Sequence, residues 1–368
     1  MAKLAVAMSG GVDSAVAAAL LVEEGHEVVG LTLNLWPEWL PEPDDAFKAC
    51  CGVSAIEDAR AVCRQLGIRH YVLNMREEFE RAVISYFVDA YAQGQTPNPC
   101  IACNQVIKFS LLLDKVTALG LEGVVTGHYA RLSRDEVNGR FLLLRGRDPH
   151  KDQSYVLYGL TQSQLARVRF PVGGLTKEAT RQLARGWGLP VADKPDSQEI
   201  CFVPRGSYTD VVARFHPDAM RPGPILDGDG RVVGEHQGIA RYTIGQRRGL
   251  GIAAGAPQYV VGLDRERNAV IVGNEDDLLC LEVVASNVNW IAIPALEGPR
   301  SVTARLRHAG RDVEATVRPG SAPNEMTVQF ARPQRAAAPG QAIALYDGDC
   351  VVGGGVVTQM RSAVTAAV

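Results

Sequence analysis

The stretch that decides the fold is KLAVAMSGGVDSAVAAALLVEE, residues 3–24. Residues 3–8 form an apolar run typical of a buried strand, Gly10-Gly11 form a turn, and residues 12–24, rich in alanine and leucine, predict a helix. A second apolar run, VVGLTL at 28–33, predicts the next strand. Because strand, helix and strand follow one another, the sequence predicts parallel strands joined by a crossover helix.

This alternation continues to about residue 205 and then changes. Further helices are expected near 54–66, 76–92 and 105–119, and further strands at 70–73 and 123–127. Beyond residue 205, short β-branched stretches are separated by Gly, Asp and Pro, which predicts antiparallel strands. We expect an α/β domain with a parallel sheet over residues 1–205. Two β-rich domains should follow, a small central domain over residues 206–275 and a second over residues 276–368.

The bulk composition is that of a folded protein with more than one core. The chain has 368 residues, of which 46% are hydrophobic and 21% charged. No apolar run approaches the roughly 18 residues that a membrane span needs, so we expect no membrane partner. Eight cysteines are too sparse for a disulfide framework, which suggests reduced thiols and a cytoplasmic location. The net charge of −3 excludes a uniformly basic surface and leaves a local RNA-binding groove open.

The loop Ser9-Gly10-Gly11-Val12-Asp13-Ser14 joins the first strand to the first helix. Backbone N–H groups at a helix start can hold a phosphate, and glycines let the backbone approach it closely. The loop matches neither the P-loop nor the dinucleotide motif, and two glycines alone would indicate only a turn. The whole string SGGVDS resembles the pyrophosphate loop of the ATP pyrophosphatases, which adenylate an oxygen atom with ATP. That resemblance implies that Asp13 helps to place Mg²⁺.

A second candidate site is TPNPCIACN, residues 96–104. Its prolines predict an extended loop, and the helix expected from about residue 105 would take Asn104 as its cap. Cys103 would then lie at a helix N-terminus, where the dipole favours the reactive thiolate. A buried structural cysteine, or half of a zinc site with Cys100, are the alternatives. No second CxxC or nearby HxxxH supplies further ligands, and Cys50-Cys51 are adjacent, so we expect no metal ligands here.

Four more stretches complete a recognisable set. They are TGHYA at 126–130, KDQSYVL at 151–157, DSQEICF at 196–202 and YTIGQRRGLG at 242–251. Together with the two stretches above, and in this order, they resemble the tRNA-specific 2-thiouridylase family. PGQAIALYDGDCVVGGG at 339–355 is similar to that family's final β-barrel. The resemblance implies an ATP-pyrophosphatase domain, a small central domain and a C-terminal β-barrel. It also implies ATP-dependent thiolation of the wobble uridine, position 34, in tRNAs for Lys, Glu and Gln.

The resemblance also implies roles for single residues. It makes Cys103 the nucleophile and Cys201 the cysteine that carries a persulfide, supplied by a cysteine desulfurase or a sulfur-carrier protein. It implies ATP contacts at Ala7, Met8, Ser9, Gly10, Gly11, Val12, Asp13, Ser14, Leu33 and Gly127. It implies tRNA contacts at Asn98, Pro99, Cys100, His128, Lys151, Asp152, Gln153, Arg305, Leu306 and Gln341.

Two departures from the family pattern affect these assignments. Many members have aspartate where this chain has Cys100, and a neutral thiol is a poorer base at pH 7 than a carboxylate. The general base is therefore open between His128, a phosphate of the substrate, and no base at all. In the barrel, RLRH at 305–308 replaces the more usual RYRQ.

The chemistry expected is sulfur transfer to an activated base. Adenylation turns the uracil O2 into a leaving group, and Cys103 then either attacks Cys201 to release sulfide, leaving a disulfide, or attacks C2 directly. A second hypothesis places a [4Fe–4S] cluster on Cys100, Cys103 and Cys201. Outside this family, an amidating synthetase of the same superfamily and a non-catalytic RNA-binding or sulfur-carrier protein are the alternatives.

Overall fold

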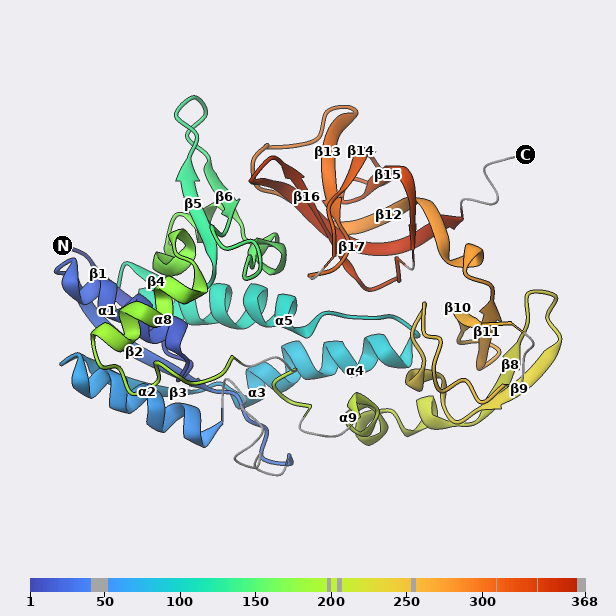
Figure 1. The fold of residues 1–368 in the computed structure, drawn as a ribbon, viewed down its shortest axis with the longest axis horizontal. Coiled ribbons are helices and arrows are strands. Elements are labelled where there is room, and N and C mark those ends of the chain that lie inside the picture. The colour runs from blue at the N-terminus through green and yellow to red at the C-terminus, as the bar shows by residue number, and fades with distance from the viewer. Residues whose placement is uncertain are drawn as a thin grey trace. The chain divides into compact units, whose positions relative to one another are not determined.

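The computed structural model describes residues 1–40, 52–196, 200–203, 207–252, 256–308, 310–335 and 337–362 (Figure 1). Cys50 and Cys51, residues 197–199 of the DSQEICF stretch and the expected boundary at 205 lie outside them. The chain forms two compact units. Unit 1 comprises Met1–Ile84, Pro99–Arg205 and Asp349–Val351; unit 2 comprises Ser85–Asn98, Gly206–Gly348 and Val352–Val368.

Unit 1 is built on a five-stranded sheet in the order β3-β2-β1-β4-β7. All neighbouring strands pair in parallel, which confirms the α/β prediction. The strands are β1 (Lys3–Ala7), β2 (Glu27–Asn34), β3 (Arg69–Asn74), β4 (Gly123–Val125) and β7 (Val168–Arg169). From β1 the chain runs outward through β2 to β3 and then returns to the other side of β1 as β4. The carboxyl ends of β1 and β4 therefore flank the point at which the strand order reverses, where ligands bind in sheets of this kind.

The first helix is apolar nearly all round because it is buried nearly all round. Helix α1 (Val12–Glu23) contributes an unbroken buried run, residues 14–19, mostly alanine. Small side chains let this helix pack closely against the sheet. One core cluster joins Val6 of β1 and Val16 of α1 with Val62 of α2 (Val53–Gln65) and Ala184 of α8 (Lys177–Gly186). This packing fixes the position of the loop before α1.

Two helices differ from the sequence prediction. Where a single helix was expected at 76–92, the structure has three consecutive elements: α3 (Arg76–Phe79), the π-helical segment η1 (Glu80–Ile84) and α4 (Ser85–Ala92). Helix α4 belongs to unit 2. The helix expected from residue 105 begins at Pro99 and runs without a break through α5 (Pro99–Ala102), the π-helical segment η2 (Cys103–Leu111) and α6 (Leu112–Ala118).

The expectation that Asn104 caps this helix was therefore wrong. Proline suits the first helical position, because its fixed φ is helical and its missing N–H has no partner there. Asn104 lies inside the helix and is 2% exposed. Its Nδ2 donates to the Val156 carbonyl at 3.2 Å, and its Oδ1 accepts from Lys108 Nζ at 3.0 Å. These tertiary contacts use the polar side chain that the sequence suggested as a cap.

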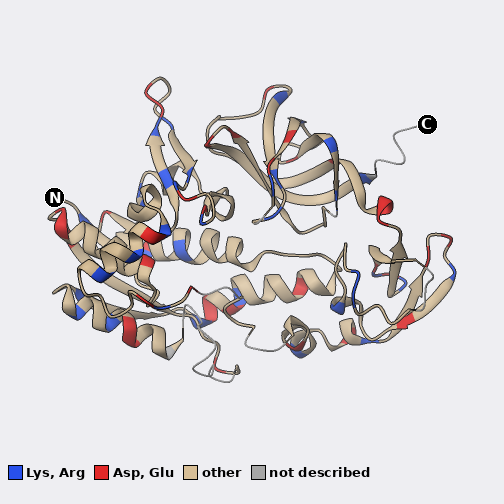
Figure 2. Ribbon diagram, viewed as in Figure 1, with Lys and Arg blue, Asp and Glu red and all other residues tan. Residues whose placement is uncertain are grey.

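The rest of unit 1 adds a β-hairpin and short helices that the sequence did not predict. Strands β5 (Ala130–Arg134) and β6 (Phe141–Arg145) pair antiparallel. The remaining elements are η3 (Ser154–Leu157), α7 (Gln162–Leu165) and η4 (Pro171–Gly174), which precede α8. Acidic and basic residues are interspersed along the ribbon (Figure 2), in keeping with the small net charge.

Unit 2 contains the β-rich domains. A four-stranded sheet has the order β10 (Tyr259–Asp264), β11 (Ala269–Gly273), β8 (Gly223–Leu226), β9 (Val232–His236), and α9 (Tyr208–Phe215) precedes it. Six strands, β12 (Leu279–Trp290), β13 (Arg300–Arg305), β14 (Val313–Pro319), β15 (Met326–Arg335), β16 (Ala342–Asp347) and β17 (Cys350–Ser362), form a barrel, which the pairing of β12 with β17 closes. This confirms the predicted small central domain and C-terminal barrel. In the described parts of the chain, no helix has both the length and the apolar character to cross a membrane.

Candidate functional site

A cavity of about 200 Å³ lies at the carboxyl ends of β1 and β4. Most of the residues predicted to bind ATP line it, together with two predicted to bind tRNA. Its walls are Ala7, Met8, Ser9, Asp13, Ser14, Leu31, Leu33, Leu35, Lys108, Thr126, Gly127, His128 and Gln153. The position matches the switch point of the sheet, so the fold and the sequence motifs select the same place.

The loop between β1 and α1 borders this cavity, and contacts of Gly10 and Ser14 fix its conformation. Gly10 has φ +65°, a left-handed conformation that favours glycine, and a Cβ there would lie 2.3 Å from the Ala55 carbonyl oxygen. Gly11 precedes the helix, and no side chain caps the helix start. Ser14 Oγ accepts from the Ser9 N–H at 3.2 Å and donates to the Gly11 carbonyl at 3.1 Å. The first N–H groups of α1 are thus left to an anionic ligand.

Gly127, on the loop after β4, is pressed against this helix start. A Cβ at Gly127 would lie 2.6 Å from both Asp13 C and Ser14 N. Only glycine allows this approach, which brings the predicted nucleotide-binding positions of two strands together. The opposite wall is apolar: Leu31 and Leu33 of β2, with Leu35 beyond it, are each less than 9% exposed. An adenine ring would be accommodated by such a wall, while phosphates would meet the loop.

A further wall comes from η2 and from the residues that follow β4. Lys108 of η2 is held by Asn104 Oδ1 at 3.0 Å. His128 Nδ1 lies 2.7 Å from Thr126 Oγ1, and its ring packs near the Phe109 ring. Burial, and then the charge of Lys108, hold the pKa of His128 well below its ordinary value of 6.5. A neutral, buried imidazole is a weak proton acceptor, which disfavours His128 as the general base.

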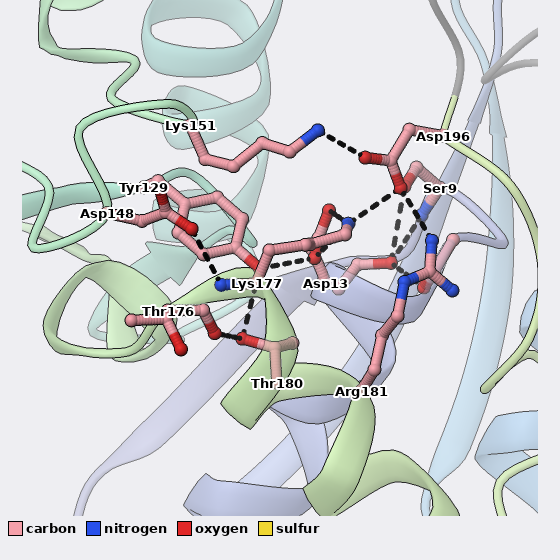
Figure 3. Close-up of polar contacts among 12 residues, drawn as sticks. Ser9, Asp13, Tyr129, Asp148, Lys151, Thr176, Lys177, Thr180, Arg181 and Asp196 are labelled. Atoms are coloured by element: carbon pink, nitrogen blue, oxygen red, sulfur yellow. Dashed lines mark hydrogen bonds and ion pairs between the residues drawn. The ribbon is translucent and has the colours of Figure 1, made fainter.

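A network of charged side chains joins the loop to α8 (Figure 3). Lys177 Nζ lies 2.8 Å from each carboxylate oxygen of Asp13, and the Tyr129 hydroxyl donates to Asp13 Oδ1 at 2.8 Å. Lys177 also lies 2.8 Å from Asp196 Oδ1, and Asp196 contacts Lys151 and Arg181 in turn. Sequence reasoning missed Lys177 and Arg181 and assigned no role to Asp196, although Asp196 opens the quoted DSQEICF stretch.

The two stretches that carry the candidate cysteines pack against the same part of unit 1. Cys100 is exposed in the first turn of α5, and Cys103, half-buried, begins η2 one turn later. Cys201 is half-buried, and the ring of its neighbour Phe202 packs edge-on against Phe79 of α3, with 5.8 Å between ring centroids. Segment η1, which follows Phe79 directly, contacts both α5 and η2. Cys103 therefore lies in the second turn, where the helix dipole is weaker than the sequence prediction assumed.

The structure gives no support to the iron–sulfur hypothesis. Within the described ranges, no three His, Cys, Asp or Glu side chains are gathered so that they could hold a metal ion. Cys100, Cys103 and Cys201 are all described, and they do not form such a group.

The residues predicted to contact tRNA are divided between the two units. In unit 1, Lys151 binds Asp196 at 2.7 Å, and Gln153 Oε1 accepts from the Tyr129 N–H at 2.9 Å. Asp152 is 5% exposed, and its Oδ1 accepts from the N–H groups of Gly146 and Ser154, so it shapes its own loop. Pro99 is buried at the start of α5.

The other predicted tRNA contacts belong to unit 2. Asn98 ends its first segment. In the barrel, Arg305 Nε donates to Asp312 Oδ1 at 2.8 Å, and Leu306 packs against the barrel core. Gln341 Oε1 accepts from the Ala338 N–H at 3.2 Å. These contacts account for the barrel residues as parts of the fold and leave their role toward tRNA a prediction.

Three family models match the chain in sequence. Residues 2–205 match the tRNA methyl transferase HUP domain, residues 209–274 the tRNA methyl transferase PRC-barrel domain, and residues 281–357 the aminomethyltransferase beta-barrel domain. In order along the chain, the three models cover the α/β domain, the small central domain and the C-terminal barrel.

Curated relatives match over nearly the full length. The tRNA-specific 2-thiouridylase MnmA of Moorella thermoacetica is 53% identical over 352 residues, 96% of this chain and 98% of that protein. The proteins of the same name from Heliobacterium modesticaldum and a Roseiflexus species are each 50% identical, over 96% and 98% of this chain and 92% and 100% of theirs. With these identities over nearly the whole of each protein, the chain belongs to the tRNA-specific 2-thiouridylase family.

Proposed function

We propose that this chain is a tRNA 2-thiouridylase, which uses ATP to activate O2 of the wobble uridine, position 34, and replaces that oxygen by sulfur. The observation that carries the proposal is a shared helical segment: η2 begins at Cys103 and carries Lys108, which lines the cavity. An activated base must meet a sulfur nucleophile next to the nucleotide that activates it. The family assignment supports the reaction class, and the shared segment supports placing Cys103 near the nucleotide.

In the first step the uridine O2 attacks the α phosphorus of ATP, and pyrophosphate leaves. The N–H groups at the start of α1 and the hydroxyls of Ser9 and Ser14 would hold the phosphates. Asp13 offers the hard oxygen ligands that suit Mg²⁺, and both of its oxygens already contact the Lys177 ammonium. Mg²⁺, when bound, would neutralise phosphate charge there and share this carboxylate with Lys177.

In the second step sulfur replaces the activated oxygen. Cys201 carries a persulfide, and the Cys103 thiolate attacks the sulfur that is bonded to the Cys201 Cβ. A Cys103–Cys201 disulfide forms, and the terminal sulfur leaves as hydrosulfide, which takes up the electron pair of the broken bond. Hydrosulfide adds to C2, AMP departs with the original oxygen, and a thiol reductant restores both cysteines. The residue that accepts the proton from the base is not assigned.

The partners follow from this chemistry. We propose tRNAs for Lys, Glu and Gln as substrates, and a cysteine desulfurase or a sulfur-carrier protein as the source of the persulfide. Unpaired anticodon bases lower the cost of presenting a base to a pocket. A cytoplasmic location fits thiols that must be reduced after each turnover.

Mass spectrometry of tRNA nucleosides tests this proposal. Unmodified tRNA incubated with the protein, ATP, a cysteine desulfurase and cysteine should yield 2-thiouridine at position 34, and omission of ATP should abolish it. If ATP is consumed without any 2-thiouridine, the proposal is wrong in substrate or in reaction.

Two substitutions test the two-thiol scheme. Cys103→Ser and Cys201→Ser should each reduce 2-thiouridine formation by more than about 100-fold, because each removes a sulfur atom that exchanges partners. Cys350→Ser, which alters a half-buried cysteine of the barrel, is the matched control and should retain activity. Full activity in either of the first two variants would contradict the scheme.

A further inference from the structure

Asp196 belongs by sequence to the stretch that contains Cys201, but its contacts lie with other residues. Its carboxylate meets three cations: Lys151 Nζ at 2.7 Å, Lys177 Nζ at 2.8 Å and Arg181 Nη2 at 3.0 Å (Figure 3). Lys177 and Arg181 lie one turn apart at the start of α8, so Asp196 joins two side chains of one helix face. Each of these contacts lies within unit 1.

One of the cations around Asp196, Lys177, also contacts the phosphate loop. Lys177 Nζ also contacts both oxygens of Asp13, and Asp13 lines the nucleotide cavity. The Lys177 side chain is only 12% exposed, so water screens its charge little. Its attraction to a nearby phosphate is therefore stronger than that of an exposed lysine. Asp196 thus binds the same Lys177 ammonium group that contacts Asp13 of the loop.

Charge balance explains what the carboxylate does. Burial raises the pKa of Asp196, but hydrogen bonds from Lys151 and Lys177 lower it by more, so the group is ionised at neutral pH. Three cations, Lys151, Lys177 and Arg181, are thus balanced by three carboxylates, Asp196, Asp13 and Asp148, the last of which accepts the Lys177 N–H. Without Asp196 the cations would repel one another, and Lys177 would pair with Asp13 alone.

Building on the ATP-dependent function proposed above, we infer that Asp196 is a positioning residue for the ATP half of the reaction. It holds Lys177 and Arg181 as the cations that stabilise the charge developing on the pyrophosphate. It takes no part in loading or transferring sulfur at Cys201, despite its place in that sequence stretch.

The inference predicts a split between two half-reactions in Asp196→Asn. The amide keeps the size of the side chain but removes the charge that attracts the cations. Release of pyrophosphate from ATP in the presence of tRNA should slow by about 10- to 100-fold, because preorganised charge acts mainly on the transition state. Loading of Cys201 with a persulfide should stay within about two-fold of the wild-type rate.

The chain offers a closely matched control. Asp193 pairs with Arg185 of the same helix at 2.7 Å, but both side chains are more than half exposed. Asp193→Asn therefore breaks an Asp–Arg pair between the same two segments, three residues away, without touching Lys177. It should leave both half-reactions within about two-fold of wild type, since exposed pairs contribute little.

The measurement pairs two readouts on the full-length protein. One is tRNA-dependent pyrophosphate release at several ATP concentrations; the other is the mass gain of one sulfur atom on Cys201 after incubation with a cysteine desulfurase and cysteine. Asp196→Glu, which keeps the charge, should recover part of the pyrophosphate rate. If Asp196→Asn does not fold, Lys177→Gln should show the same split.

Two results would overturn the inference. One is wild-type pyrophosphate release in Asp196→Asn; the other is loss of persulfide loading in that variant. A wild-type protein that releases no pyrophosphate with tRNA would instead contradict the proposed function, and the two failures can thereby be told apart.

Discussion

Gly127 sets how closely the loop after β4 approaches the start of α1. The Cβ of any other residue would lie 2.6 Å from backbone atoms of Asp13 and Ser14, and backbone has no alternative rotamer with which to yield. The contact is a matter of shape alone, since Gly127 brings no charge or hydrogen-bonding side chain. A substitution of Gly127 therefore changes the shape of the predicted nucleotide site without changing its charge.

Gly127→Ala should weaken ATP binding by at least about 10-fold, because the added methyl group must push the phosphate loop away from β4. Isothermal titration calorimetry with ATP measures this directly. Gly174→Ala is the control: a Cβ there meets nothing within 4 Å, so binding should be unchanged. Equal ATP affinity in Gly127→Ala and wild type would show that the loop can move without cost.

Cys103 shows how a single helix boundary changes a chemical expectation. The helix begins at Pro99, so Cys100 occupies the first turn and Cys103 the second. The dipole acts mostly on the first turn and therefore favours ionisation of Cys100 more than of Cys103. In the proposed reaction Cys103 would be placed by its segment, η2, whose Lys108 lines the cavity.

Two π-helical segments lie against each other in unit 1. Segments η1 and η2 are in contact, and η2 carries Cys103 and Lys108. π-Helical turns are uncommon and occur often at functional sites, where the wider turn re-aims side chains. Phe202, which follows Cys201, is 1% exposed, and its ring packs against Phe79 of α3. The packing of the Phe202 ring on Phe79 thus anchors the chain next to Cys201.

Phe202→Ala should lower the free energy of unfolding by about 3–5 kcal/mol, the usual cost of a cavity left by a buried phenyl ring. It should also slow sulfur transfer, because Cys201 loses the anchor beside it. Urea denaturation and 2-thiouridine formation measure the two effects. Phe202→Leu should lose less stability, and Val137→Ala, at a side chain that is 97% exposed, should lose none. Wild-type stability in Phe202→Ala would contradict the anchoring role.

In the part of the chain that the structure describes, burial makes His70, His128 and His236 harder to protonate than they are in an unfolded chain. Burial lowers the pKa of His70, His128 and His236 below 6.5. While these histidines are neutral in both the folded and the unfolded chain, their ionisation does not affect the free energy of unfolding. Below pH 6.5 the unfolded chain takes up protons that the folded chain refuses, so stability falls with pH.

The melting temperature should therefore be lower at pH 5.5 than at pH 7.5. Each unit by which a folded pKa lies below the unfolded one contributes about 1.4 kcal/mol to the loss, once the pH has fallen through both values. Differential scanning calorimetry at the two pH values checks this. His128→Gln removes one of the three groups and should show a smaller difference. A melting temperature that does not change between these pH values would contradict the expectation.

The fold was predictable where its signals are local. Apolar runs and turn residues mark β1, α1 and β2 to within a residue or two, and the change of texture near residue 205 marks the β-rich part. Positions that depend on packing were not predictable. Asn104, expected as a cap, lies inside the helix that begins at Pro99 and donates to the carbonyl of Val156, which lies 52 residues away.

The amino-acid sequence by itself determined the nucleotide loop, because an apolar strand, two glycines and an alanine-rich helix are contiguous in residues 3–24. It also marked Cys103 and Cys201, by their flanking motifs, as the candidate working thiols. Only the tertiary structure decided that Lys177, 164 residues after Asp13, neutralises that carboxylate, and that Asp196 serves the same network. The physical reason is range: hydrophobic periodicity acts between neighbours along the chain, whereas an ion pair forms wherever folding brings opposite charges together.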